Sequence, residues 1–338
     1  MRFTHCAAIL ITVPISGILL VATAATASAF SGPEPGRVVE SCIAVSATIP
    51  VGSGPVGVSA NPKSHTIYVT NFSDNTVSVI SGHTNTVTAT IPVGTEPNGV
   101  AANPKTHTIY VTNELGNTVS VINGNTNDVT KTIRVGSNPA AAAVNQESST
   151  VYVTNSGPPS NSVSVINGQK NKVTATVPVG RQPSGVAANP ETNTIYVTNF
   201  SDNTVSVISG LTNTVTATIP VGSGPVGVAV NPETNTLYVV NEFSNTVSVI
   251  SGQTNTVTAA LPVGPDAIRV AANPETNTLY VTNAGGNTVS VINGRTNTVT
   301  ATIPVGTEPN GVAANPKTNT SYVANSISNT VSVLAPCP

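Results

Sequence analysis

One unit of this sequence reads Gly99-Val-Ala-Ala-Asn-Pro104, then Thr108-Ile-Tyr-Val-Thr-Asn113, then Asn117-Thr-Val-Ser-Val-Ile-Asn-Gly124, then Val129-Thr-Lys-Thr-Ile-Arg-Val-Gly136. Each piece is short, rich in β-branched residues and alternates apolar with polar side chains, which is the pattern of a half-buried β-strand. Asn-Pro, Asn or Gly ends each piece, as a turn requires. The unit therefore predicts four short strands, numbered here first to fourth.

Tyrosine marks the repeat of this unit along the chain. The seven tyrosines are separated by steps of 42, 42, 44, 42, 42 and 42 residues, and the longer step contains an insertion at Ser156–Ser160. A period near 42 with strand-like composition is typical of propellers and other repeat arrays. Seven such units predict an all-β fold, a seven-bladed β-propeller with four-stranded blades, and an open β-solenoid is the alternative.

The two ends of the array complement each other. Ile43–Val51 matches the fourth strand of a unit (compare Thr298–Val305), whereas Asn329–Leu334 matches the third strand and no fourth strand follows it. A ring needs such a complement to close, and an open solenoid has no use for it. We therefore expect the N-terminal strand to complete the last blade.

Two cysteines lie at this predicted junction. Aligned with the unit before, Cys337 takes the place of Arg295 and Cys42 the place of Thr296, which are adjacent positions in the turn between the third and fourth strands. A disulfide between them would replace the missing covalent turn, with the strand ends splayed slightly to reach disulfide geometry. The alternative is a pair of free thiols.

The N-terminus has the pattern of a secretory signal. Arg2 precedes an apolar run from Cys6 to about Ala25, and the small residues Ala27-Ser28-Ala29 form a cleavage site. We expect a signal peptide at 1–29, an N-terminal lead at 30–42 and the propeller at 43–338, with an uncleaved anchor as the alternative. No later apolar stretch is long enough for a membrane span. The expected product is a monomer that is secreted, periplasmic or held at the cell surface.

The second strand carries a recurrent motif. Tyr-Val-Thr-Asn occurs at Tyr68–Asn71, Tyr110–Asn113, Tyr152–Asn155, Tyr196–Asn199 and Tyr280–Asn283. It resembles the YVTN family of β-propeller repeats over nearly all of the mature chain. The resemblance implies a propeller, in a family that includes exported bacterial propellers and archaeal surface-layer proteins. Propellers of similar appearance include streptogramin-type lyases and the haem d1 domain of nitrite reductases, so catalytic residues must be sought here.

Variation among the units concentrates in two sets of loops, those before each first strand and those after each second strand. In a propeller these loops share one surface, here called the variable face, and loops on a rigid scaffold carry recognition. Drift in exposed loops is the alternative. The binding candidates on this face are Asp74, Glu96, Glu114, Arg181, Asp202, Glu242, Asp266, Arg269 and Glu308, together with Phe72, Phe200 and Phe243.

Charge restricts the kind of partner. Only 8% of the 338 residues are charged and the formal net charge is −2, which excludes a polybasic nucleic-acid binder. Seven carboxylates against two arginines on the variable face would repel a phosphate backbone, so no nucleic acid is expected there. Single-stranded nucleic acid on the weakly basic opposite face is an alternative. A basic protein, a cell-surface ligand or a cation suits the variable face better.

The histidines argue against catalysis. His65, His83 and His107 occupy turn positions that other residues hold in the other units, away from the variable face. No nucleophile–histidine–acid set is therefore expected, and no catalytic residue is assigned. The best oxygen-ligand cluster, Asn71–Asn75, contains asparagines that recur in all seven units, which predicts loop capping. No metal or cofactor is expected, and Ca²⁺ at such a loop is the alternative.

The near-verbatim blades favour a repeated surface over a unique active site. The leading interpretation is an exported, non-enzymatic propeller that acts as a binding or cell-surface scaffold, or as an adhesion module. The alternative is a lyase-type propeller enzyme with its site at the channel mouth. Asp266 and Arg269, which break the pattern of the sixth unit, are the residues that favour this alternative.

Overall fold

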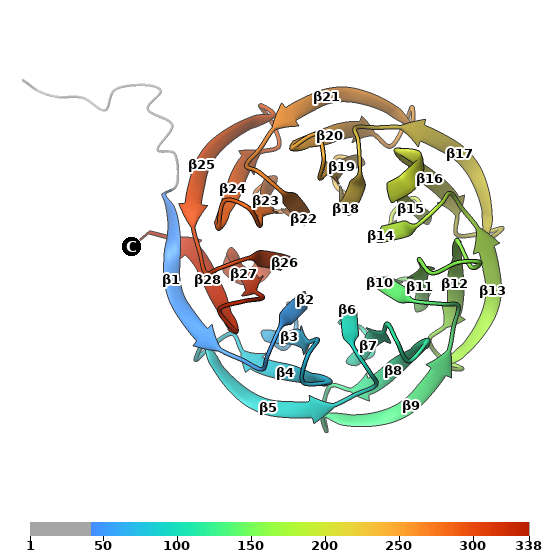
Figure 1. Ribbon diagram of the computed structural model, residues 1–338, viewed down its shortest axis with the longest axis horizontal. Coiled ribbons are helices and arrows are strands. Elements are labelled where there is room, and N and C mark those ends of the chain that lie inside the picture. The colour runs from blue at the N-terminus through green and yellow to red at the C-terminus, as the bar shows by residue number, and fades with distance from the viewer. Residues whose placement is uncertain (1–41, 338) are drawn as a thin grey trace, which may run out of the picture. The chain divides into compact units, whose positions relative to one another are not determined.

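The computed structural model describes residues 42–337, so the expected signal peptide lies outside the described residues. Within them, 28 strands form seven four-stranded antiparallel sheets arranged as blades around a central axis (Figure 1). The predicted seven-bladed β-propeller is confirmed. The described helices are two 3₁₀ turns, η1 (Phe200–Asp202) and η2 (Pro316–Thr318), neither of which could span a membrane.

The strands repeat in order around the ring. First strands, nearest the axis, are β2 (Pro55–Asn61), β6 (Pro97–Asn103), β10 (Pro139–Asn145), β14 (Pro183–Asn189), β18 (Pro225–Asn231), β22 (Ala267–Asn273) and β26 (Pro309–Asn315). Second strands are β3 (Thr66–Asn71), β7 (Thr108–Asn113), β11 (Thr150–Asn155), β15 (Thr194–Asn199), β19 (Thr236–Asn241), β23 (Thr278–Asn283) and β27 (Thr320–Asn325). Third strands are β4 (Thr76–Ser81), β8 (Thr118–Asn123), β12 (Ser162–Asn167), β16 (Thr204–Ser209), β20 (Thr246–Ser251), β24 (Thr288–Asn293) and β28 (Thr330–Pro336). Fourth strands, at the rim, are β5 (Thr86–Pro92), β9 (Asp128–Arg134), β13 (Lys172–Pro178), β17 (Thr214–Pro220), β21 (Thr256–Pro262), β25 (Thr298–Pro304) and β1 (Ile43–Pro50).

The core lies between blades. The second and third strands are buried along almost their whole length, whereas the outer strands expose most of their residues. In one such layer Tyr68 and Ile91 of the first blade pack against Val100 and Ile109 of the second blade. Each blade therefore needs a neighbour on both sides to bury its apolar residues, which is why the array closes into a ring.

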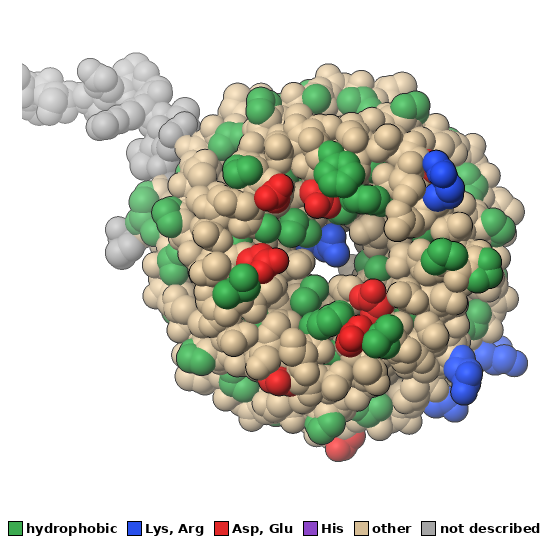
Figure 2. Space-filling view, in the orientation of Figure 1, with side chains coloured by type: hydrophobic (Ala, Val, Ile, Leu, Met, Phe, Trp, Pro, Cys, Tyr) green, Lys and Arg blue, Asp and Glu red, His purple; other side chains and the backbone are tan. Residues whose placement is uncertain are grey.

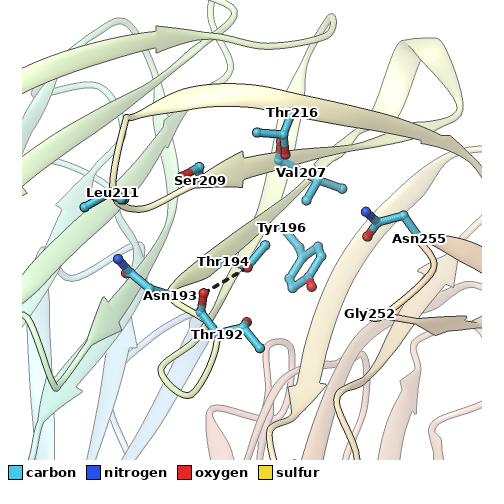
Figure 3. Close-up of a pocket in the computed structure, with 10 residues that line it drawn as sticks. All are labelled: Thr192, Asn193, Thr194, Tyr196, Val207, Ser209, Leu211, Thr216, Gly252 and Asn255. Atoms are coloured by element: carbon cyan, nitrogen blue, oxygen red, sulfur yellow. Dashed lines mark hydrogen bonds between the residues drawn. The ribbon is translucent and has the colours of Figure 1, made fainter.

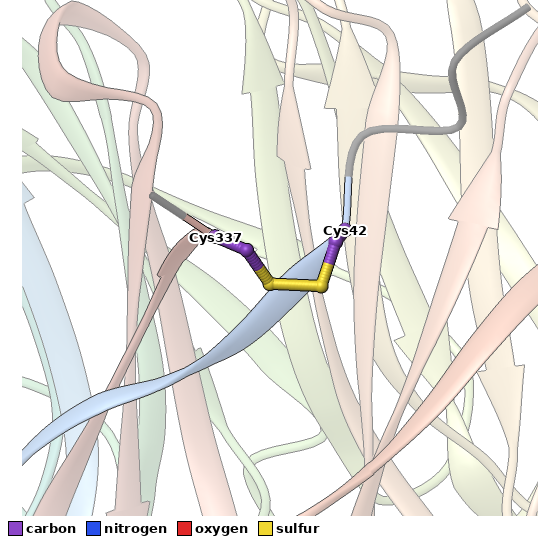
Figure 4. The surroundings of a disulfide bond; sticks show 2 residues. All are labelled: Cys42 and Cys337. Atoms are coloured by element: carbon purple, nitrogen blue, oxygen red, sulfur yellow. A yellow bond between two sulfur atoms is a disulfide. The ribbon is translucent and has the colours of Figure 1, made fainter.

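The ring closes as the sequence predicts. β1 pairs antiparallel with β28, so the last sheet has the order β1-β28-β27-β26. Cys42 and Cys337 form a disulfide with Cα atoms 5.3 Å apart (Figure 4), within the usual range for disulfides. The backbone N–H of Cys337 donates to the carbonyl of Cys42 at 2.8 Å. The predicted disulfide thus lies where the last blade lacks a covalent turn.

Asparagine is abundant because the turns need a left-handed residue. Most of the non-glycine residues with positive φ are asparagines at the end of a tight turn, for example Asn75 at 58° and Asn85 at 54°. Asparagine tolerates this conformation better than other residues with a Cβ atom. His65 and His107, at 51° and 52°, take the same turn position, in keeping with their predicted role as polar turn residues.

Candidate functional site

The two sets of variable loops lie on one face, as propeller connectivity requires, and they are hydrogen-bonded to each other. The N–H of Glu114, which follows a second strand, donates to the carbonyl of Glu96, which precedes a first strand, at 2.9 Å. The N–H of Glu96 in turn donates to Asn75 Oδ1 of the preceding blade at 2.7 Å. These hydrogen bonds connect adjacent blades and make the variable face a continuous rigid surface.

Carboxylates surround the opening of the central channel on this face, here called the channel mouth (Figure 2). Glu96, Asp266 and Glu308 hold the same position, one residue before a first strand, with φ of 54°, 50° and 55°. Glu114 and Glu242 directly follow second strands, close to the same loops. First and second strands are the two nearest the axis, so these five acids lie at the inner part of the face.

Asp74 and Asp202 lie farther from the axis, and both are bonded to a neighbouring loop. Asp74 accepts a hydrogen bond from the N–H of Ser53 at 2.6 Å. Asp202 accepts one from the N–H of Arg181 at 2.7 Å and forms an ion pair with its side chain at 2.6 Å. Hydrogen bonds from the backbone and side chain of Arg181 lower the pKa of Asp202. In other blades serines such as Ser244 make the same loop contact.

The phenylalanines differ in exposure. Phe243 is 65% exposed and stacks edge-to-face on Phe200, with ring centroids 5.2 Å apart. Phe200 is half-buried and packs against the apolar layer between blades. Phe72, at the matching position of the first blade, is also half-buried. Phe243 is therefore the aromatic side chain of this set that is most accessible to a partner.

Arg269 lies on β22, among the strands that surround the channel, and a Lys or Arg side chain is visible in the opening (Figure 2). Its backbone is held as in other blades: its N–H donates to Thr282 Oγ1 at 3.1 Å, and that hydroxyl donates to the carbonyl of Asn310 at 2.7 Å. Its side chain makes one long hydrogen bond, from Nη1 to the carbonyl of Ile268 at 3.5 Å. None of the three ion pairs found in residues 42–337 includes Arg269.

Arg269 and Glu242 influence each other electrostatically, and Asp266 acts on Glu242. Burial lowers the pKa of Arg269 below its ordinary value, and the Glu242 carboxylate opposes this shift. Burial raises the pKa of Glu242 and the charge of Asp266 raises it further, whereas Arg269 lowers it. The three residues come from the fifth blade, the connecting loop and the sixth blade, so this mixed charge occurs at one point on the ring.

Two polar residues at the channel mouth escaped the sequence interpretation. Asn98 Nδ2 donates to Glu114 Oε2 at 2.8 Å, whereas Asn310 Oδ1 is buried without a hydrogen-bond partner. Both hold the second position of a first strand, where other blades have different residues. That variation was visible in the sequence, in the loops before the first strands, but the binding candidates there were limited to charged and aromatic residues. The other occupants are Val56, Ala140, Ser184, Val226 and Ile268.

Grooves on the opposite face repeat from blade to blade. One lies between the fourth and fifth blades, has a volume of about 410 Å³ and is lined by Thr192, Tyr196 and Asn255 among others (Figure 3). A second, of about 340 Å³, is lined by residues 42 positions further along, such as Thr234 and Asn297. Their linings carry hydroxyl and amide groups and no charge. They are products of the repeat and lack the unlike residues that an active site needs.

The histidines lie on this opposite face too. His65 and His83 have ring centroids 4.5 Å apart, and the carbonyl of His65 accepts a hydrogen bond from the N–H of Gly82. Over the described part of the chain, no group of three or more His, Cys, Asp or Glu residues is placed to hold a metal ion. Asn71, in the loop considered for Ca²⁺, uses its Nδ2 to donate to Thr76 and Ser78 at 2.9 Å.

Comparison with known proteins places the chain in a family. The model of the YNCE-like beta-propeller family matches residues 24–198, and that of the seven-bladed lactonase propellers matches residues 208–336. The chain belongs to the YNCE-like β-propeller family. The solved structure of Kuenenia stuttgartiensis hydrazine synthase is similar with a TM-score of 0.76 and 22% identity, over 83% of this chain and 95% of that one. This likeness shows the shared propeller fold. No curated protein sequence matches the chain.

Proposed function

We propose that this protein is an exported binding scaffold that presents its variable face to a basic protein or a cationic cell-surface ligand. The observation that carries the proposal is the ring of five carboxylates at the channel mouth. Clustered charges of one sign on a rigid surface attract an oppositely charged partner and raise its association rate. The near-identical blades suit a scaffold, and the Cys42–Cys337 disulfide suits an oxidising compartment outside the cytoplasm.

Charge reversal at the channel mouth tests this proposal. The double variant Glu96→Lys, Glu308→Lys is expected to weaken binding to immobilised poly-lysine by about tenfold or more, because electrostatic steering changes association rates by such factors. Biolayer interferometry measures the effect. The matched control is Glu191→Lys, Glu233→Lys, which makes the same charge change at exposed residues of the opposite face. Equal weakening by both variants would show net charge alone at work and would overturn the proposal.

A propeller enzyme with its site at the channel mouth is the second candidate. The lactonase model covers Glu242, Asp266 and Arg269, which are three unlike residues at one point on the ring. In a lactone hydrolysis the guanidinium of Arg269 would polarise the carbonyl. Glu242, with its raised pKa, would take a proton from the attacking water and return it to the ring oxygen as the C–O bond breaks.

This candidate predicts activity that depends on the channel. Hydrolysis of glucono-δ-lactone, followed by acid release at constant pH, is expected to exceed the spontaneous rate and to fall by about a hundredfold in Glu242→Gln, since general acid–base catalysis contributes factors of this order. Added divalent cations test for metal dependence. A rate equal to that of buffer, with and without cations, would contradict lactonase activity and leave the scaffold interpretation in place.

A further inference from the structure

Arg269 is an exception to a strict rule of the ring. The same position of the first strand is Gly57, Gly99, Ala141, Gly185, Gly227 or Gly311 in the other blades. At most of these positions a side chain has little room: a Cβ atom on Gly57 would lie 2.3 Å from the carbonyl oxygen of Asn98 on the next blade. The repeat therefore favours a small residue here. The sixth blade instead carries an arginine at this position, which the packing of the blades does not require.

The guanidinium of Arg269 is poorly satisfied by the protein. It has five N–H donors, and the structure gives it one long contact, 3.5 Å to the carbonyl of Ile268. Arg269 is half-buried, and burial lowers its pKa. A partly desolvated cation without an anionic partner is costly, and a carboxylate that accepts two parallel N–H bonds offsets that cost. The channel therefore offers a place for the carboxylate of a ligand.

The surroundings disfavour a simple anion. Glu242 and Asp266 lie in the loops next to Arg269, and three further carboxylates surround the same opening. A phosphate or a dicarboxylate would have to cross this negative potential. A ligand with a cationic group as well gains from both signs of charge.

We propose that the channel mouth binds a small zwitterion of the amino-acid class, with its carboxylate on Arg269 and its ammonium group toward Glu242 and Asp266. This small-molecule site goes beyond the proposed scaffold function. A small ligand would lie on Arg269 inside the opening, whereas a macromolecular partner would contact the carboxylates around the opening. The two proposals are also tested by different variants, so that either can fail without the other.

Calorimetry with small probes tests the site on the full chain. Glycine and lysine are the zwitterionic probes, and acetate, methylammonium and inorganic phosphate carry one sign of charge each. We expect the amino acids to bind at least about tenfold more tightly than the singly signed probes, since each charge-assisted hydrogen bond is worth such a factor. Binding should weaken as salt is added.

The variants use residues that the repeat already accepts. Arg269→Ala places the residue of the third blade, Ala141, at the same position, and it is expected to weaken amino-acid binding at least about tenfold while the melting temperature stays within a few degrees. Arg295→Ala, which removes an exposed arginine on the opposite face, is the matched control and should bind like the wild type. Glu242→Gln should weaken the binding of glycine and lysine and leave that of acetate unchanged or stronger.

Three results would overturn the proposal. Acetate or phosphate binding as tightly as glycine would make the site one for simple anions. Unchanged glycine binding in Arg269→Ala would place the ligand elsewhere. Absence of binding by every probe would overturn it directly, and a large loss of thermal stability in Arg269→Ala would then assign Arg269 a structural role beside the nearby carboxylates.

Discussion

Replacing both cysteines that join the two ends of the ring, as Cys42→Ser and Cys337→Ser, is expected to lower the free energy of unfolding by about 5 kcal/mol. The disulfide joins residues 295 positions apart, so it closes a loop that contains the whole propeller. In the chain-entropy model such a crosslink restricts the unfolded chain more strongly the longer the loop is, and for several hundred residues the effect reaches about 5 kcal/mol. Denaturant unfolding of the wild type and the double variant measures the difference.

The fold predicts how the variant should fail. β1 pairs with a single neighbour, β28, and the disulfide lies at the end of this pairing. Without the crosslink β1 can detach and expose Ile49 and Val331, which are buried where β1 closes the last blade. Hydrogen exchange should therefore rise first in β1 and β28 of the variant. Reduction of the wild-type disulfide is the control and should lower the free energy of unfolding by the same amount. Equal stability of the oxidised and reduced proteins would contradict a stabilising role for the disulfide.

The sequence predicted the fold because every level of the repeat agrees. The tyrosines mark the period, the β-branched runs mark the strands, and the mismatched ends at Ile43–Val51 and Asn329–Leu334 predict closure. The pairing of β1 with β28 and the Cys42–Cys337 bond confirm that reasoning. Such predictions succeed when local pattern and overall architecture point to the same structure.

The site was less predictable because it depends on how loops meet. Propeller connectivity predicts which loops share the variable face. It does not predict which carboxylates on that face are already hydrogen-bonded to neighbouring loops. In the sequence Asp74 and Asp202 look like Glu96, since all three are acidic residues in variable loops. In the structure the carboxylates of Asp74 and Asp202 are hydrogen-bonded to neighbouring loops. The position of Arg269 breaks the repeat and was visible in the sequence. Its lack of an ionic partner depends on side-chain positions that no repeat pattern contains.

Alkaline pH is expected to unfold the propeller in one steep transition, because all of its tyrosines are buried. The seven tyrosines are each 1% exposed, and burial raises the pKa of every one above its ordinary value. In the unfolded chain these hydroxyls return to a pKa of about 10. Below that pH both states keep the phenolic protons, so the tyrosines add no pH dependence.

Above that pH the folded and unfolded chains bind different numbers of protons, and the difference destabilises the fold. The unfolded chain then binds fewer protons than the folded chain, so the free energy of unfolding falls as pH rises toward the folded-state pKa. The slope is at most about 1.4 kcal/mol per pH unit for each tyrosine, and seven together approach about 10 kcal/mol per pH unit. A modest rise in pH can therefore remove the whole stability of a typical protein.

Tyrosinate absorbance and far-ultraviolet circular dichroism, followed through one pH titration, test this prediction. The chain has seven tyrosines and no tryptophan, so the absorbance reports these positions without interference. Both signals should change together and steeply, above the pH at which a free tyrosine ionises. Tyr196→Phe removes one titrating hydroxyl and should make the transition shallower by about one seventh, because each buried proton contributes equally to the slope. A gradual appearance of tyrosinate centred near the ordinary pKa, with the strand signal unchanged, would mean that solvent reaches these hydroxyls and that the layers between blades are not closed.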